Sequence, residues 1–441
     1  ELAYALGRAF VTHLNHAHGR AYIIAAGRDN RPSSPCLHGA FCDGAASLGC
    51  EVRDMGLAST PLVDFAVARH SLDGGVCITG SHNSPSRNGF KLDAHDAIPL
   101  TGDDIQHLRL LMHSDDGAVL PPGDIATLDV LNEYLDAVAA LVTIARPLRV
   151  VVDAGNAVMG LIAPPLFQRL GCEVVCLFCD LDSSFPNHIP NPENHDNLRS
   201  LQKEVLRQGA DLGIAFDADG DRLGVVDETG TVFPPERILM ALARDHLSRH
   251  SGAPVLVDVK SSRTVVEDIS THGGLPVLRP SGHSLIRRRM RNTGIELAGE
   301  YSGHFFVAEG FHYTSDALVA VARIVALLSR SGLPLSRMLG RVAQRFTSGL
   351  IELPAKEHTK RQLVAKVGAQ LAARYPVIDI DGYRVETADG WALIRASNTG
   401  PRLTLRFEAD SPDKLRQIQS EVMGLLSELA TRVASEAETR Q

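Results

Sequence analysis

At 441 residues the chain is too long for one hydrophobic core, and at roughly 100 to 200 residues per domain it predicts three or four domains. Hydrophobic residues make up 44% and charged residues 22% of the sequence, which is typical of a globular protein and excludes a disordered one. The net charge of −8 argues against nucleic acid or an anionic membrane surface as the main partner. Any anion-binding site must therefore be local.

Cysteine usage favours a reduced, cytoplasmic setting, because the seven cysteines are odd in number. Three of them, Cys172, Cys176 and Cys179, lie in CEVVCLFC, which we interpret as a buried strand. They could be metal ligands, but no His or further Cys pair with zinc-site spacing accompanies them, and small apolar core residues are the better interpretation. No apolar run approaches the roughly 20 residues that span a bilayer.

One pattern of elements occurs three times in chain order. It begins at AYIIAAGRDNR (21–31), at LRVVVDAGNAVMG (148–160) and at PVLVDVKSS (254–262). Each apolar run ends in a polar loop and is followed by a predicted helix and a second extended run, which is the pattern of a βαβ unit in a mostly parallel sheet. We therefore predict three related α/β domains with mixed, mostly parallel sheets.

After about residue 346 the elements become shorter, and the chain ends in an extended stretch, 390–410, and an amphipathic helix from Pro412. This tail predicts a smaller C-terminal α+β domain. We place the four domains at 1–128, 129–231, 232–345 and 346–441.

TGSHNSPSRNGFK (79–91) follows the apolar run VCI and is too rich in Gly, Ser, Asn and Pro to be a helix or strand. It presents Ser81 beside His82, with Lys91 a few residues later. Ser81 could be a nucleophile, a phosphate ligand or a turn former, and His82 raises the possibility of a Ser-His hydrolase pair.

FDADGDRLG (216–224) places Asp217, Asp219 and Asp221 at alternate positions between the apolar runs GIAF and LGVV. A tight loop could turn all three carboxylates inward, where their repulsion is most simply relieved by a hard divalent cation such as Mg²⁺. The alternative is an acidic solvated turn partly neutralised by Arg222. An EF-hand is excluded, because Arg222 stands where that loop needs Gly and the flanks are typical of strands.

Two further loops carry polar groups suited to a sugar phosphate. RASNTGP (395–401) offers a guanidinium, hydroxyls and backbone N–H groups before a strand of alternating pattern, although it could be a plain turn. GEYSGH (299–304) could hydrogen-bond vicinal sugar hydroxyls, or its serine could be a helix cap. A serine, a Mg²⁺ site, a phosphate site and a hydroxyl-binding loop together indicate phosphoryl transfer on a polyol phosphate.

These motifs occur in the order found in a known family. TGSHNSPSRNGFK looks like the phosphoserine loop, DADGDR the metal loop, GEYSGH the sugar loop and RASNTGP the phosphate loop of the α-D-phosphohexomutases. GRDNR, FPNHIPNPE, DVKSS and SGHSLI add to the likeness, which covers essentially the whole chain. The chain most closely resembles the bacterial phosphomannomutase/phosphoglucomutase branch. The resemblance implies four domains around a central cleft.

The resemblance also implies an activity, which is the interconversion of hexose 1-phosphates and 6-phosphates through a bisphosphorylated intermediate. Ser81 would be the phosphorylated donor, and it would hold Mg²⁺ together with Asp217, Asp219 and Asp221. The implied candidates for proton transfer and electrostatic support are His82, Lys91, Arg222, Lys260 and His283.

Substrate binding is implied in the same way. Glu300 and Ser302 would recognise sugar hydroxyls, with His304 on the same loop. The phosphate that does not react would be bound by Arg395, Ser397, Asn398 and Thr399. The partners would be hexose phosphates of glucose and mannose, with glucose or mannose 1,6-bisphosphate as activator, and we expect a monomer that binds neither nucleic acid nor membrane.

The sequence departs from the family pattern in several places, including the region near Arg87 and the stretch GFHYTSDAL (310–318), which replaces a more acidic one. Ser84 precedes Pro85 where proline usually follows Ser-His-Asn, and Tyr301 stands where this branch often has Met. The resemblance also implies a short Tyr-Asp-Ile-Arg-Gly segment before the first helix, which is either absent or outside this sequence. The alternatives are a Mg²⁺-dependent sugar phosphatase, a phosphoglucosamine mutase, which typically has Ser-Gly-Thr-Glu-Pro in the phosphate loop, and a non-catalytic sugar-phosphate sensor.

Overall fold

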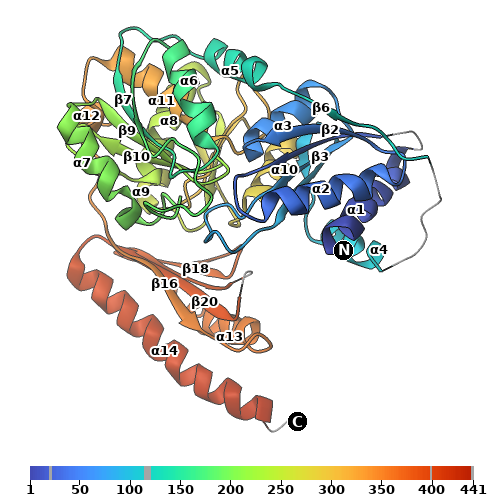
Figure 1. The fold of residues 1–441 in the computed structure, drawn as a ribbon. Helices are drawn as coiled ribbons and strands as arrows, with labels where there is room; N and C mark the ends of the chain where they lie inside the picture. Colours follow the sequence, from blue (N-terminus) through green and yellow to red (C-terminus); the bar gives the residue numbers. More distant parts are fainter. Residues whose placement is uncertain (19–21, 114–120, 398–399, 439–441) are drawn as a thin grey trace. The chain divides into compact units, whose positions relative to one another are not determined.

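The structure is a computed structural model that describes residues 1–18, 22–113, 121–397 and 400–438 (Figure 1). It divides into two compact units. Unit 1 contains residues 1–255 and 282–339, and unit 2 contains residues 256–281 and 340–441. We describe each unit by itself.

The N-terminal part of unit 1 is built on a six-stranded sheet of order β5-β4-β3-β1-β2-β6. The pairs β1–β2, β1–β3 and β2–β6 are parallel, whereas β3–β4 and β4–β5 are antiparallel. The strands are β1 (Ile23–Arg28), β2 (Glu51–Leu57), β3 (Gly74–Ile78), β4 (Phe90–Ala94), β5 (Ile98–Pro99) and β6 (Ile125–Thr127). The helices are α1 (Leu2–His18), α2 (Ser34–Ala46), α3 (Thr60–Arg69), α4 (Asp103–Leu111) and α5 (Leu131–Ala140), with a 3-10 turn at His95–Ala97.

Apolar side chains explain how helices pack on this sheet. Phe10 of α1 and Phe41 of α2 are fully buried in one cluster with Ile24 of β1. On α3, Val63 approaches the sheet at Gly27 and Gly75, where an added Cβ would lie 2.6 Å and 3.2 Å from its methyl groups. Small residues in the strands therefore let α3 pack closely. The parallel pairing of β1 with β3 places their carboxyl ends next to each other.

The second sheet of unit 1 has the order β11-β10-β9-β7-β8, with parallel pairs β7–β8 and β7–β9 and an antiparallel hairpin β9–β10. Its strands are β7 (Arg149–Asp153), β8 (Glu173–Leu177), β9 (Leu212–Phe216), β10 (Leu223–Asp227) and β11 (Val232–Phe233). Helices α6 (Met159–Arg169) and α7 (Arg199–Gln208) accompany it, with a 3-10 turn at His195–Leu198.

The interpretation of CEVVCLFC as a buried strand is wrong in part. Its strand, β8, lies at the edge of the second sheet and is only half-buried. Cys172 is buried before it, but Cys176 is exposed and Cys179 is half-buried. An edge strand has a neighbour on one side only, so apolar residues there are not necessarily covered. All seven cysteines are free thiols.

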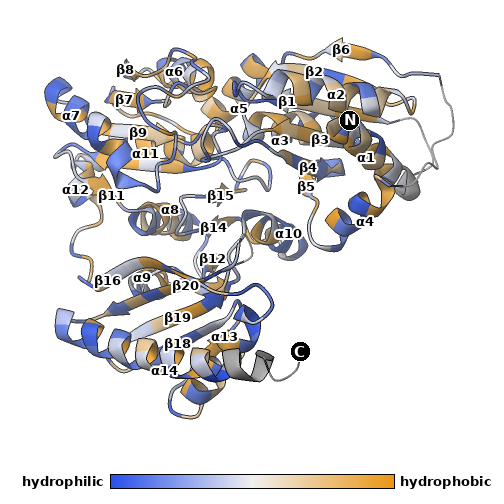
Figure 2. Ribbon diagram, turned by 60° about the horizontal axis from the view of Figure 1, so that its bottom comes forward, coloured by the Kyte–Doolittle hydropathy of each residue, from blue (hydrophilic) through white to orange (hydrophobic). Residues whose placement is uncertain are grey.

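The remaining elements of unit 1 are mostly helical. They are α8 (Pro235–Arg249), α10 (His283–Thr293), β14 (Leu297–Gly299), β15 (Phe305–Val307), α11 (Ala317–Ser331) and α12 (Leu335–Met338). β14 and β15 pair in antiparallel fashion. Helix α11 is capped by Asp316, whose Oδ1 accepts hydrogen bonds from the N–H groups of Leu318 and Val319. Its hydrophobic residues (orange in Figure 2) are buried at almost every position, so α11 is a core helix.

Unit 2 combines one βαβ segment with an antiparallel sheet. The segment consists of β12 (Pro254–Asp258), which begins in unit 1, with α9 (Arg263–Thr271) and β13 (Leu275–Arg279). The sheet has the order β16-β20-β19-β18-β17. Its elements are β16 (Phe346–Pro354), α13 (Lys360–Ala372), β17 (Val377–Asp379), β18 (Tyr383–Thr387), β19 (Gly390–Ala396), β20 (Arg402–Ala409) and α14 (Pro412–Glu438).

The sheet of unit 2 is covered on both faces. The strand of alternating sequence after RASNTGP is β20, and it is buried at every position from Leu403 to Ala409. One face packs on α13 and α14, while Val259 packs with Trp391 and Leu393 of β19 in a separate cluster. The amphipathic helix predicted from Pro412 is confirmed as α14. Among the described residues, no helix has the length and apolar character needed to cross a bilayer.

Candidate active site

The polar loop after β3 holds Ser81 at the end of a fully buried strand. Ser81 has a left-handed backbone with φ 48°, and its N–H donates to Thr79 Oγ1 at 2.8 Å. This conformation is uncommon for a residue with a side chain, and it turns the hydroxyl out of the strand direction. Ser81 Oγ lies 2.8 Å from Asp217 Oδ2 and 3.2 Å from His82 Nδ1.

A buried ion pair from the GRDNR loop supports the serine loop from behind. The Arg31 guanidinium donates to the carbonyl oxygens of Ser81 (2.5 Å), Asn83 (2.9 Å) and Ser84 (2.5 Å). Its Nε pairs with Asp29 Oδ2 at 2.9 Å, and both side chains are fully buried. Asp29 Oδ2 also accepts from Thr79 Oγ1 at 2.8 Å. We did not select Asp29 and Arg31 as site residues from the sequence, although their motif was visible as part of the resemblance.

The predicted metal loop is the turn of the β9–β10 hairpin. Asp217, Asp219 and Asp221 are 0–1% exposed, and each offers a carboxylate oxygen within 4.8 Å of the other two. Asp219 Oδ1 is buried without a hydrogen-bond partner, whereas its Oδ2 accepts from Thr60 Oγ1 at 2.5 Å. A buried, unsatisfied carboxylate oxygen among three carboxylates fits the oxygen-ligand preference of Mg²⁺.

Lys91 supplies the positive charge nearest to these carboxylates. Its Nζ lies 2.6 Å from Asp219 Oδ2 and 2.5 Å from Asp221 Oδ2. Burial lowers the pKa of Lys91, but the charges of Asp219 and Asp221 outweigh burial and raise it above the ordinary value. Burial, together with Asp219 and Asp221, raises the pKa of Asp217. Lys91 is therefore a cation, and it neutralises only part of the charge of the loop.

Histidines around the loop differ in charge. Burial followed by the Arg222 charge lowers the pKa of His82 to about 4, and burial followed by the Lys91 charge lowers that of His283 to about 3. Burial also opposes protonation of His304, but Asp221 outweighs it and raises the pKa to about 9. His283 and His304 are stacked with ring centroids 5.4 Å apart. Near neutral pH one stacked ring is neutral and the other is protonated.

The predicted sugar loop is joined directly to the metal loop. His304 Nε2 lies 3.4 Å from Asp221 Oδ1, and its Nδ1 lies 3.2 Å from Glu300 Oε2 and 2.8 Å from Ser302 Oγ. The backbone of Leu223 donates to Gly303 O at 3.0 Å. Arg222 and His304 form an isolated antiparallel β-bridge between the two loops. Within the metal loop, the Arg222 backbone N–H donates to Asp217 Oδ1 at 3.1 Å. The Arg222 side chain pairs with Glu193 at 3.0 Å.

Unit 1 thus brings together nine of the residues selected from the sequence: Ser81, His82, Lys91, Asp217, Asp219, Asp221, Arg222, Glu300 and His304. Ser302 and His283 contact His304. Residues from three separate loops therefore form one cluster within a single compact unit.

The other selected residues lie in unit 2. Lys260 is buried, with Nζ 3.4 Å from Asp258 Oδ2. Arg395 pairs with Asp381 at 3.0 Å, and Ser397 is buried. Lys360, which sequence reasoning missed, donates to the carbonyls of Ser397 (2.6 Å) and Gly400 (2.9 Å) and so supports both ends of the phosphate loop.

Asn398 and Thr399, also selected from the sequence, lie outside the described residues.

Comparison with protein families matches all four domain models of phosphoglucomutase/phosphomannomutase. Alpha/beta/alpha domains I, II and III match residues 1–117, 132–230 and 234–346, and the C-terminal domain matches 350–425. The chain belongs to the phosphoglucomutase/phosphomannomutase family. The family prediction and the predicted fold of three α/β domains with a smaller C-terminal domain are therefore confirmed, as is the prediction of an enzyme of this class.

Individual proteins of this family resemble the chain over nearly its full length. It is 39% identical over 423 residues to the phosphomannomutase/phosphoglucomutase of Pseudomonas aeruginosa, covering 95% of this chain and 90% of that protein. It is 38% identical over 430 residues to a phosphoglucomutase of Neisseria meningitidis, covering 97% and 93%. A crystal structure of a phosphoglucomutase/phosphomannomutase family protein from Burkholderia thailandensis has a TM-score of 0.90 at 36% identity, covering 96% and 92%.

Proposed function

We propose that this protein transfers a phosphoryl group between O1 and O6 of glucose and mannose phosphates, with Ser81 as the residue that carries the phosphoryl group between half-reactions. The contact of Ser81 Oγ with Asp217 Oδ2 at 2.8 Å is the observation that carries this proposal. It places the hydroxyl at the carboxylate cluster and not in isolation beside a histidine. Family membership supports the same reaction class.

The carboxylates of Asp217, Asp219 and Asp221 would hold Mg²⁺ together with the phosphorylated Ser81. The ion would neutralise the charge on the transferring phosphoryl group. Lys91 contributes a fixed positive charge at the same place, and Arg31 holds the loop backbone so that the hydroxyl is positioned before substrate arrives.

Proton transfer would be divided among groups whose charges differ. His283 is neutral near pH 7 and can accept a hydrogen bond, although its lowered pKa makes it a weak base, whereas the cation His304 can only donate hydrogen bonds. We retain His82, Arg222 and Lys260 as further candidates for electrostatic support. Glu300 and Ser302 would bind sugar hydroxyls beside His304.

The substrate phosphate that does not react would be bound by Arg395, Ser397, Asn398 and Thr399. Binding energy from this remote phosphate would hold the reacting hydroxyl in position. Reorientation of the bisphosphate intermediate in the site would exchange its two phosphates between the phosphate loop and Ser81. Glucose or mannose 1,6-bisphosphate would therefore both activate the enzyme and be its intermediate. We propose hexose phosphates as partners of a monomeric enzyme.

The test combines turnover with the phosphorylation state of Ser81. Glucose 1-phosphate and mannose 1-phosphate are supplied with Mg²⁺ and the bisphosphate, and both 6-phosphate formation and intact mass are measured. We expect turnover of both sugars and one added phosphoryl group per chain. Ser81→Ala should abolish both, whereas Ser86→Ala, an exposed serine of the same loop, should leave both unchanged.

Other outcomes would identify the alternatives. Release of inorganic phosphate faster than 6-phosphate formation would show a phosphatase. Turnover of glucosamine phosphate in preference to both hexose phosphates would show a phosphoglucosamine mutase. Unchanged turnover in Ser81→Ala would contradict the assignment of the serine.

A further inference from the structure

A second group of possible metal ligands lies at the carboxyl-terminal end of α8, outside the loops described above. His246, His250 and Glu296 each offer one ligand atom, and these atoms lie within 4.8 Å of one another. His246 is buried, Glu296 is half-buried and His250 is exposed. The two histidines are four residues apart, which places them on one side of the helix, and their ring centroids are 4.7 Å apart.

A fourth residue orients both rings. Glu309 Oε2 lies 3.1 Å from His246 Nδ1, and its Oε1 lies 3.2 Å from His250 Nε2. Histidines that bind a metal usually pair their other ring nitrogen with a carboxylate, which fixes the tautomer and strengthens the ligand. One nitrogen of each ring contacts Glu309, so an ion bound with Glu309 in this supporting position would use the other nitrogen of each ring.

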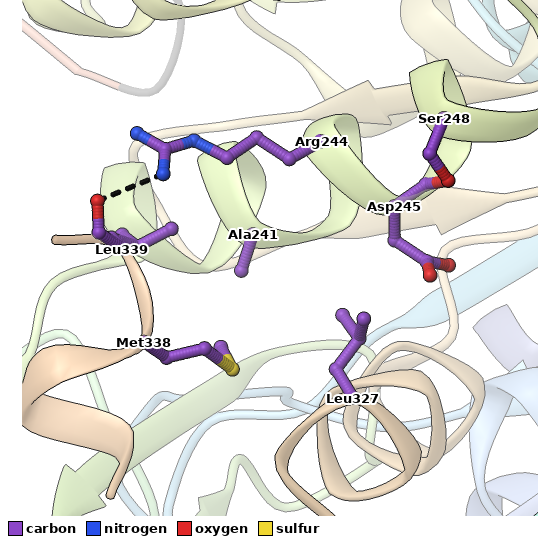
Figure 3. A pocket seen from close by; sticks show the side chains of 7 residues that line it. All are labelled: Ala241, Arg244, Asp245, Ser248, Leu327, Met338 and Leu339. Atoms are coloured by element: carbon purple, nitrogen blue, oxygen red, sulfur yellow. Dashed lines mark hydrogen bonds between the residues drawn. The ribbon is translucent and has the colours of Figure 1, made fainter. Parts of the chain in front are cut away.

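The charge of Glu309 is already balanced by Arg249. Arg249 donates from Nε to Oε1 at 3.0 Å and from Nη2 to Oε2 at 2.9 Å. Its Nη1 pairs with Asp245, which lines a pocket on a different face of α8 together with Arg244 and Ser248 (Figure 3). Glu309 therefore serves as a supporting residue, and Glu296 is the carboxylate left for an ion.

A backbone hydrogen bond holds Glu296 next to Glu309 and the two histidines. The carbonyl oxygen of Glu296 accepts a hydrogen bond from the N–H of Ala308 at 2.8 Å, immediately before Glu309. This bond extends the β14–β15 pairing by one step. The two carboxylates thus come from neighbouring strand ends, while the imidazoles come from α8.

We propose that His246, His250 and Glu296 bind a transition-metal dication, with Zn²⁺ as the best fit and water as the fourth ligand. Two imidazoles and one carboxylate suit Zn²⁺, whereas Mg²⁺ prefers the oxygen ligands of the aspartate loop. Zinc bonds of about 2.0–2.1 Å keep tetrahedral ligand atoms roughly 3.3 Å apart, so the group would close slightly on binding. The exposed side chain of His250 can make that movement.

Such an ion would join α8 to the β14–β15 hairpin, whose turn contains the sugar loop. It would act as a structural clamp in unit 1 and would not take part in phosphoryl transfer. Binding should therefore raise the midpoint of thermal unfolding without being required for the reaction.

The experiment uses the full chain stripped of metal with a chelator and then kept in excess Mg²⁺, so that the aspartate loop is occupied. Zn²⁺ is titrated against a chromophoric chelator, and Co²⁺ is titrated while visible absorption is followed, because tetrahedral Co²⁺ absorbs strongly and octahedral Co²⁺ does not. We expect one equivalent of Zn²⁺ that Mg²⁺ does not displace and a tetrahedral Co²⁺ spectrum.

Variants separate this site from other binding. His250→Ala and Glu296→Gln should abolish binding of the one equivalent of Zn²⁺. Glu309→Gln should lower the affinity for Zn²⁺ by about tenfold or more through loss of the supporting carboxylate. His195→Ala, an exposed histidine elsewhere in unit 1, should bind as the unmodified chain does. The proposal is wrong if the unmodified chain binds no such equivalent, or if His250→Ala binds Zn²⁺ equally well.

Discussion

Ser81 Oγ donates a hydrogen bond to Asp217 Oδ2 at 2.8 Å, although the two residues are 136 positions apart in the chain. The contact joins the loop after β3 to the turn of the β9–β10 hairpin. This contact shows that the Ser81 hydroxyl is directed at the carboxylates of the metal loop as well as at the neighbouring His82. His82 Nδ1 is 3.2 Å away, but burial and the Arg222 charge lower its pKa to about 4, which makes it a weak base for activating the serine.

Replacing Arg31 by lysine should impair catalysis more than stability. Lysine keeps the charge beside Asp29, but it cannot donate to the carbonyls of Ser81, Asn83 and Ser84 at once. A displacement of Ser81 by about 1 Å would lower kcat/KM roughly 100-fold. Steady-state rates should show this loss in Arg31→Lys but not in Arg53→Lys, an arginine of β2 that pairs with Glu51. Equal rates in both variants would contradict the role of Arg31.

Replacing Lys91 by methionine should make the protein depend on Mg²⁺ for stability. Removing one partner of a buried pair costs about 3–5 kcal/mol, because Asp219 and Asp221 lose their counter-charge. In the presence of a chelator, the midpoint of thermal unfolding of Lys91→Met should therefore lie well below that of the unmodified chain. Added Mg²⁺ should raise the midpoint of the variant more than it raises that of the unmodified chain. Lys203→Met, on the exposed surface of α7, is the control. A Mg²⁺ effect no larger than in the unmodified chain would rule out a shared charge.

Asp316 should make stability depend on pH. Burial raises its pKa from 3.8 to about 6 in the folded protein, despite hydrogen bonds from α11 and Tyr134. A raised folded pKa means that this contribution is fully present below about pH 4 and is lost as the pH rises through 6.

The variant Asp316→Asn lacks this titration while keeping an acceptor for the helix N–H groups. Its stability relative to the unmodified chain should rise by roughly 2–3 kcal/mol between pH 4 and pH 7, as two pKa units predict. Denaturant unfolding at several pH values measures the difference. The control is Asp413→Asn, an exposed aspartate in the first turn of α14, which leaves the buried carboxyl of Asp316 in place. A constant difference for Asp316→Asn would show that its carboxyl does not titrate in this range.

Replacing Lys360 by methionine should weaken substrate binding. The Lys360 ammonium holds the carbonyls of Ser397 and Gly400, so its loss would loosen the phosphate loop without removing a ligand. We expect KM for glucose 1-phosphate to rise about tenfold with a smaller effect on kcat, as expected when uniform binding is lost. Lys414→Met, a surface lysine of α14, is the matched control. A fall in kcat at constant KM would place Lys360 in the chemical step instead.

Arg384 should stabilise the loop that carries Lys260. Its guanidinium lies 3.9 Å from the ring centroid of Trp391 and donates to the carbonyls of Val259 (2.8 Å) and Ser261 (2.7 Å). Arg384→Met should lower the unfolding midpoint of unit 2, since a desolvated cation–π contact is worth about 2 kcal/mol and two hydrogen bonds are also lost. Trp391 is the single tryptophan of the chain, so its fluorescence reports this transition directly. An unchanged midpoint would mean that the stack contributes nothing.

Predictions from the sequence succeeded where the decisive contacts are local. The aspartate hairpin could be predicted because Asp217, Asp219 and Asp221 lie within five residues between two apolar strands. Predictions failed where packing decides burial. Cys176 was interpreted as a core residue, but its strand lies at a sheet edge, where one side has no neighbouring strand.

The histidine pair at 246 and 250 shows the same division. Its four-residue spacing is present in the sequence and was overlooked, whereas Glu296 and Glu309 can be added only from the structure, because strand pairing brings them to α8.

The sequence by itself determined the family, the order of the α/β units and most of the chemical groups at the candidate site, because these depend on residue type, short spacing and hydrophobic pattern. Tertiary structure decided which groups meet. The pairing of Ser81 with Asp217, the support of the serine loop by Arg31 and the different charges of His283 and His304 all depend on contacts between distant segments. Burial then sets their electrostatics, because a charge removed from water interacts strongly with whichever neighbour the fold places beside it.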